Sequence, residues 1–237
     1  LEANTTGSDN VAVGTDAGTA ITTGNTNIAI GGLAMQTNTV GDRNVAIGYS
    51  ALETYNPSSN EDSYNVAVGY AALEADTTGK NNTAVGGNAL LVNTTGGNNT
   101  AVGTGALDAN TTANDNTAVG RSALGANTTG TRNVAVGALA LDANTTANDN
   151  TVIGYDAATA NTTGTQNTVI GTYAFDANTT GSYNTAVGRA ALSSNTTASN
   201  NTAIGVSALE ANTTGANNTA VGVSSLTSCT GSSNTAF

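Results

Sequence analysis

The sequence predicts an all-β protein, a parallel β-solenoid with one 17-residue repeat in each coil. Three observations support this. A stretch such as Asn-Thr-Ala-Val-Gly at residues 82–86, or a close variant, begins fourteen units along the chain. Successive units lie 17 residues apart in all but two places. Each unit also joins a β-compatible segment, such as Thr83–Val85, to a polar stretch whose Asn, Thr and Gly residues favour corners.

The first residue of every unit is Asn, and we expect these residues to form a structural ladder. In a parallel stack, equivalent residues lie above one another, so their side-chain amides can hydrogen-bond along the stack. The complete units begin at Asn10, Asn27, Asn44, Asn65, Asn82, Asn99, Asn116, Asn133, Asn150, Asn167, Asn184, Asn201 and Asn218, and a partial unit begins at Asn234.

The next three positions alternate between the two faces of the expected strand. We expect Val or Ile at the fourth position, such as Val85, to form an apolar column in the core. Leu at the ninth position, such as Leu90, should form another. Ala at the third position, such as Ala84, then faces the other way, toward solvent or a neighbouring chain across a close interface.

A helical solenoid and a stack of hairpins both fit the sequence poorly. Seventeen residues make about 4.7 helical turns, so an apolar stripe would rotate away from any fixed face within two repeats. Tight hairpins favour Asn-Gly turns, and the chain contains no Asn-Gly pair.

The repeat indicates one tandem-repeat segment over residues 1–237, with an irregular insertion at about residues 53–64. The insertion falls in the polar half of its unit, where a stacked architecture tolerates changes of length. Leu1 to Gly7 is the back half of a unit, and Asn234 to Phe237 is the front of another. We therefore expect the segment to be truncated at both ends.

The composition excludes an ordinary globular core and several classes of partner. Charged residues make up 9% and aromatic residues 4% of the chain, which has no Trp and no His. The net charge is −11, and the five basic residues are scattered, which argues against binding to nucleic acid. No apolar run is long enough to span a bilayer, so we expect no membrane insertion in this segment.

The sequence offers little for catalysis, and we expect neither enzymatic activity nor a cofactor. With no His, the chain lacks the usual base near neutral pH. Asn-Asp-Asn corners provide oxygen ligands of the type that calcium prefers, which makes Asp115 and Asp149 weak calcium candidates. Acids at such corners are equally typical of turns.

Asn-x-Thr sequons recur at the twelfth position of the unit and are possible N-glycosylation sites. Bulky glycans on every coil would crowd one another, and a chain rich in Asn and Thr forms sequons by composition alone. The residues concerned are Asn93, Asn110, Asn127, Asn144, Asn161, Asn178, Asn195 and Asn212.

The Asn-Val-Ala-Val-Gly units at residues 65–69 and 133–137 and the Asn-Ile-Ala-Ile-Gly unit at 27–31 resemble the head repeats of YadA-like trimeric autotransporter adhesins. The longer unit is similar to repeats of bacteriophage tail fibres and bacterial surface fibres. This resemblance covers essentially the whole chain. It implies a left-handed β-roll, three chains around a common axis, and a location on the cell surface or virion tail. The 17-residue period departs from the shorter repeat of the adhesin heads.

Together these features predict a structural or adhesive segment of an extracellular fibre, either a rigid stalk or a head. Its expected partners are further copies of the chain, in a homotrimer or another self-assembly into a fibre, and a host-surface glycan or protein receptor. The alternatives are a carbohydrate- or ice-binding β-solenoid, to which regular Thr columns would be suited, and a heavily N-glycosylated surface filament.

Overall fold

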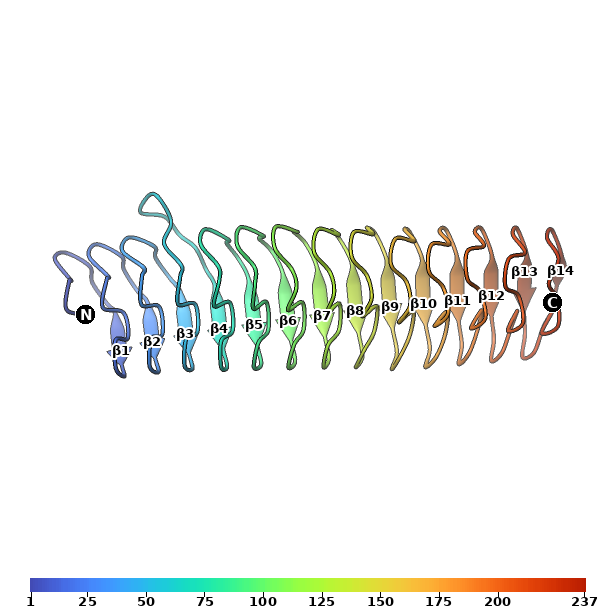
Figure 1. Ribbon diagram of the computed structural model, residues 1–237, viewed down its shortest axis with the longest axis horizontal. Coiled ribbons are helices and arrows are strands. Elements are labelled where there is room, and N and C mark those ends of the chain that lie inside the picture. The colour runs from blue at the N-terminus through green and yellow to red at the C-terminus, as the bar shows by residue number, and fades with distance from the viewer. The chain divides into compact units, whose positions relative to one another are not determined.

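The computed structural model describes residues 1–237 and contains strands and turns but no helix. The chain forms two compact units, Leu1–Asn116 and Thr117–Phe237. Each unit is a stack of similar coils, and each coil contributes one short strand (Figure 1). This confirms the predicted all-β parallel β-solenoid.

Within each unit, consecutive strands pair in parallel. Equivalent residues of successive repeats are register partners, as in Ala84 with Ala101 and Ala186 with Ala203. The first unit contains β1 (Val11–Val13), β2 (Ile28–Ile30), β3 (Val45–Ile47), β4 (Val66–Val68), β5 (Thr83–Val85) and β6 (Thr100–Val102). The second unit contains β7 (Thr117–Val119), β8 (Val134–Val136), β9 (Thr151–Ile153), β10 (Thr168–Ile170), β11 (Thr185–Val187), β12 (Thr202–Ile204), β13 (Thr219–Val221) and β14 (Thr235–Ala236).

Backbone hydrogen bonds also join the coils outside the strands. The Leu90 N–H donates to the Ala106 carbonyl at 3.0 Å, and the Thr94 N–H donates to the Thr111 carbonyl at 2.8 Å. These bonds repeat from coil to coil, so the backbone of the turns is satisfied by the neighbouring coil much as that of the strands is. Three residues per strand are therefore enough to hold the stack.

The structure reverses the expected faces of the strand. Ala84 and the other third-position residues from Ala29 to Ala220 are fully buried, whereas Val85 is only half-buried and Ile170 is 40% exposed. The prediction of a Val or Ile core column with outward Ala was therefore wrong. The reason is space: Leu from the ninth position and Asn from the first and twelfth positions already occupy the interior, which leaves room mainly for a methyl group at the third.

The predicted Leu column does lie in the core, where Leu90 and Leu107 are fully buried. The first repeat shows how the column and its neighbours share volume. There Gly18 replaces the Leu and Ile21 replaces the Asn of the twelfth position. A Cβ atom at Gly18 would lie 3.0 Å from the Ile21 Cδ1 atom, so Ile21 fills the space that Leu fills elsewhere.

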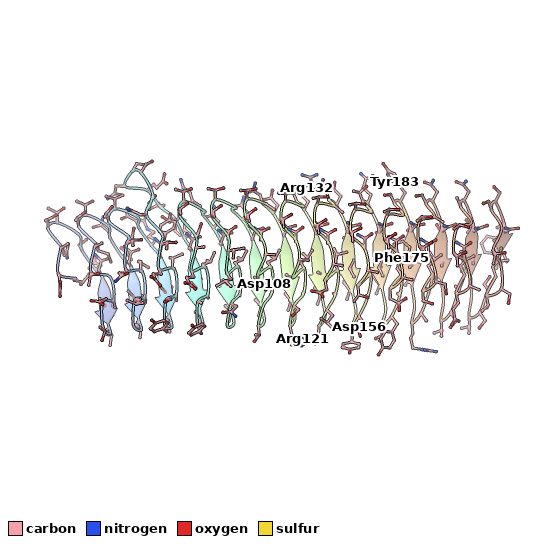
Figure 2. The ribbon with its side chains drawn as sticks, in the orientation of Figure 1. Asp108, Arg121, Arg132, Asp156, Phe175 and Tyr183 are labelled. Carbon is pink, nitrogen blue, oxygen red and sulfur yellow. The ribbon has the colours of Figure 1, made fainter.

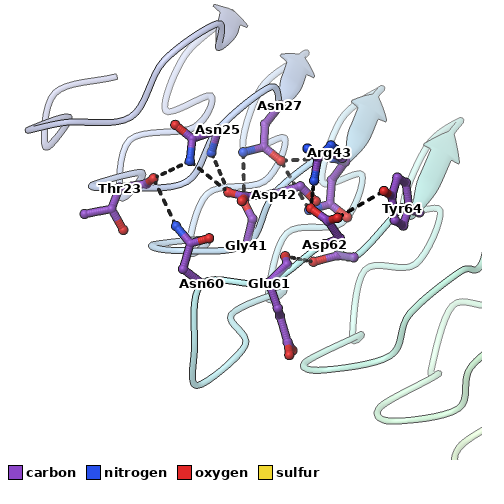
Figure 3. Close-up of polar contacts among 12 residues, drawn as sticks. Thr23, Asn25, Asn27, Gly41, Asp42, Arg43, Asn60, Glu61, Asp62 and Tyr64 are labelled. Carbon is purple, nitrogen blue, oxygen red and sulfur yellow. Dashed lines mark hydrogen bonds and ion pairs between the residues drawn. The ribbon is translucent and has the colours of Figure 1, made fainter.

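The insertion forms a loop that projects between β3 and β4 (Figure 1). Polar contacts fasten it to the neighbouring coils (Figure 3). Asp62 forms an ion pair with Arg43, and Glu61 lies 2.6 Å from the Lys80 ammonium. Asn60 donates from Nδ2 to the Thr23 carbonyl at 3.3 Å. The loop thus contacts coils on both sides of its own.

Candidate functional site

The ladder asparagines occupy a buried column along one side of the strands in each unit. The Asn99 N–H donates to Asn82 Oδ1 at 3.0 Å, and the Asn201 N–H donates to Asn184 Oδ1 at 3.0 Å. The Oδ1 atom of each side chain therefore accepts from the backbone of the next coil. Asn10 is half-buried, and the other twelve ladder residues of the complete 17-residue repeats are buried.

The twelfth-position asparagines form a second buried column, which the sequence interpretation missed. Asn93 donates from Nδ2 to the Gly96 carbonyl at 3.0 Å, and Asn82 donates from Nδ2 to the same carbonyl at 2.8 Å. One buried carbonyl in the coil thus accepts bonds from both columns. The sequence did carry a signal for this column, namely the near-constant Asn at the twelfth position. An exposed polar corner would vary more freely in residue type from repeat to repeat.

This second column contains the residues proposed as possible glycosylation sites. Asn93, Asn110, Asn127, Asn144, Asn161, Asn178, Asn195 and Asn212 are all 0–1% exposed. The Nδ2 atoms of Asn178 and Asn195, which a glycan would modify, donate hydrogen bonds inside the coil. A glycan attached there would have to lie in the core, so the folded coil has no room for it.

Three other residues interrupt the second column besides Ile21. Tyr55, Asp76 and Cys229 stand at its twelfth position in their repeats. Burial raises the pKa of Asp76 to about 7. Its Oδ1 atom accepts from the Gly79 N–H at 2.9 Å and from Asn93 Nδ2 at 3.3 Å, whereas its Oδ2 atom is buried without a partner. Burial likewise raises the pKa of Tyr55 to about 12.

The two weak calcium candidates lie near the surface. Asp115 is exposed and accepts a hydrogen bond from Asn98 Nδ2 at 3.1 Å. Asp149 pairs with Arg132, whose Nε lies 2.6 Å from Asp149 Oδ1, and this bond lowers the pKa of Asp149. No three His, Cys, Asp or Glu side chains are grouped so that they could hold a metal ion.

The structure has no pocket, and none of its elements is a helix of the length and hydropathy that would cross a bilayer. Two outer faces of the coils carry distinctive side chains.

The first is the strand face, formed by the second- and fourth-position side chains of each strand. In the second unit it presents a column of Thr or Val beside a column of Val or Ile. Ile153, Ile170 and Ile204 are 39–40% exposed. An apolar column of this kind, bordered by Thr in most strands, is typical of a surface that meets another protein.

The second is the tyrosine corner of the second unit, which we define as Arg121, Tyr155, Asp156, Tyr173 and Arg189. These residues occupy the sixth and seventh positions of their repeats, directly after the strand and its Gly. Figure 2 shows Arg121 and Asp156 on the edge of the coils opposite to Arg132 and Tyr183. The rings of Tyr155 and Tyr173 meet edge to face, with centroids 5.7 Å apart.

A related pair lies in the first unit. The rings of Tyr49 and Tyr70 are stacked, with centroids 5.7 Å apart and an interplanar angle of 11°. Both occupy the sixth position, and neither has an arginine at that position in the adjacent repeats. The sequence interpretation singled out neither pair, because the corner is variable and its members are far apart along the chain.

In comparisons with known proteins, no protein-family model and no curated protein matches this chain.

Proposed function

We propose that the chain is a structural segment of an extracellular fibre, on a cell surface or a virion tail, in which three copies assemble through their strand faces. Each copy would be a left-handed β-roll, as in the adhesin heads that the repeats resemble. The segment would act as a stiff spacer or adhesive shaft rather than as an enzyme.

The observation that carries this proposal is the outward Val and Ile column. Burying it against another copy would remove apolar surface from water at about 25 cal/mol per Å². Every strand contributes similar side chains, so the favourable contact repeats with each coil. A homo-oligomer matches such a repeating surface, because a second copy presents the same period.

The internal bonding supports a mechanical role. Backbone bonds link each coil to the next on several sides, and the two Asn columns brace the interior. In these repeats, positions that a globular enzyme would vary to build a pocket are instead used to hold successive coils in register. Stacks of this kind gain length by repetition, which is the property a spacer requires.

The mass of the assembly in solution, measured by light scattering after size-exclusion chromatography, tests the proposal. We expect three times the 23.0 kDa of one chain. Replacing both Ile153 and Ile170 by Glu should give a folded monomer, because paired carboxylates would be buried in the interface. The matched control replaces Thr163 and Thr180 by Glu. These are exposed residues of the same two repeats on another side of the coil, so this variant should stay trimeric. A wild-type monomer at micromolar concentration would refute the assembly.

A further inference from the structure

Equivalent positions in the other repeats show which residue types the coil requires at the tyrosine corner. At the sixth and seventh positions other coils carry residues such as Gly87, Thr104 and Asn88, so the coil itself does not need an aromatic side chain at either position. Tyr155 and Tyr173 are nevertheless 46% and 44% exposed. Large aromatic surface left in water without a folding role indicates a surface that contacts a ligand.

The basic residues without ion pairs also belong to the tyrosine corner. Of the five basic residues, Arg43, Lys80 and Arg132 form ion pairs. Arg121 and Arg189 form none, and both belong to the tyrosine corner. In a chain of net charge −11, two guanidinium groups without carboxylate partners on one edge form a local site for an anion.

The spacing of these groups is regular along the stack. Arg121, Tyr155 and Arg189 all occupy the sixth position, each two repeats after the last. At about 4.8 Å per coil, this places a group every ~10 Å, with ~19 Å between the two arginines. Two coils thus match the length of a disaccharide in an extended pyranose chain.

The remaining member, Asp156, lies between the arginines along the corner. Hydrogen bonding to Asp156 raises the pKa of Tyr155. A carboxylate at this corner offers hydrogen-bond acceptors to sugar hydroxyls.

We propose that the tyrosine corner of the second unit binds a linear acidic polysaccharide. The carboxylate or sulfate groups of the glycan would pair with Arg121 and Arg189, and an intervening pyranose would pack its C–H face on the rings of Tyr155 and Tyr173. Bidentate pairing of arginine with a carboxylate or sulfate provides specificity as well as affinity. This inference rests on the extracellular role proposed above, but it requires no particular oligomeric state.

A single-stranded nucleic acid would also offer anions and flat rings. It fits this corner less well, because the surrounding surface is acidic and two arginines supply little of the phosphate neutralisation on which such binding depends. Nucleic acid is therefore kept as an outcome of the test.

Titration calorimetry on the full chain tests the proposal with three probes long enough to span both arginines. They are a hyaluronan oligosaccharide, a heparin oligosaccharide and a neutral cello-oligosaccharide. We expect saturable binding of at least one acidic probe, weakened at high ionic strength, and little binding of the neutral one. The two acidic probes separate carboxylate from sulfate recognition.

Two double variants separate the contributions of charge and stacking. Arg121→Gln with Arg189→Gln, and Tyr155→Ala with Tyr173→Ala, should each weaken binding about tenfold or more. The matched control is Tyr49→Ala with Tyr70→Ala, which removes a tyrosine pair from a corner without arginine and should leave acidic-glycan binding unchanged. Circular dichroism checks that each variant is folded.

Three results would overturn the proposal. The first is the absence of saturable binding of either acidic probe to the wild type, and the second is equal binding by the corner variants. The third is tighter binding of a single-stranded oligonucleotide through the same residues. Light scattering reports the trimer independently, so a failure of glycan binding and a failure of assembly are distinguishable.

Discussion

At the scale of single residues, Asn is used for its double capacity to donate and accept. In the second column, its Oδ1 can accept from the N–H three residues on, as Asn178 does from Gly181, while its Nδ2 donates to that residue's carbonyl. Asp76 keeps the acceptor and loses the donor, and its Oδ2 is left without a partner. A buried carboxylate in this place favours its protonated form.

The first prediction concerns the pH dependence of stability at Asp76. Its pKa is about 7 in the folded chain against an ordinary value of 3.8, so the folded state binds more protons between these values. The free energy of unfolding should therefore fall as the pH rises from about 4 to about 7. Asp76→Asn should abolish this component and stabilise the protein at pH 8 by up to about 4 kcal/mol.

Denaturant unfolding followed by circular dichroism at several pH values measures this effect. Asp115→Asn is the control, because it removes the same charge from an exposed side chain of the same unit. Identical pH profiles for wild type and Asp76→Asn would show that the buried carboxylate does not govern stability.

At the scale of the strand and its corner, the recurring Gly is required by the neighbouring coil. Gly86 follows β5 with φ of 136°, a conformation that L side chains rarely adopt. A Cβ atom there would lie 2.6 Å from both the carbonyl carbon and the oxygen of Gly103. At the next residue, Gly87, a Cβ atom would meet nothing within 4 Å, so this position is open to substitution.

The second prediction compares these two adjacent glycines. Gly86→Ala should destabilise the first unit by about 3 kcal/mol or more, because it combines backbone strain with a clash against backbone atoms. Gly87→Ala should change stability by no more than about 0.5 kcal/mol. Thermal unfolding of both variants gives the comparison, and equal melting temperatures would contradict the close approach of the coils.

At the scale of the whole molecule, each coil makes the same contacts with its neighbours in its unit. Stability should then be close to a sum over coils and their interfaces. Because the register repeats every 17 residues, removing one whole repeat restores every column, whereas removing part of a repeat shifts each column onto the wrong position.

The third prediction uses this periodicity within the second unit. Deleting residues 151–167 joins Asn150 to Thr168 and should give a folded protein whose strand signal falls only in proportion to its length. Deleting residues 151–159 removes half a repeat and should unfold the adjacent coils. Circular dichroism and limited proteolysis report the difference, and similar protease resistance of the two deletions would argue against additive coils.

The sequence by itself determined the period, the parallel stacking, the Leu column and the first Asn column, because each is visible as a residue that returns every 17 positions. Only the tertiary structure decided which face of the strand lies inside. Val85 and Ala84 are both apolar, so polarity does not decide which of them points into the core. That depends on the volume that the closed coil leaves after Leu90 and the two Asn columns are placed. Tertiary structure likewise brought Arg121, Tyr155 and Arg189 onto one edge. Neighbours along the stack are far apart in the chain, and only closure of each coil makes them adjacent.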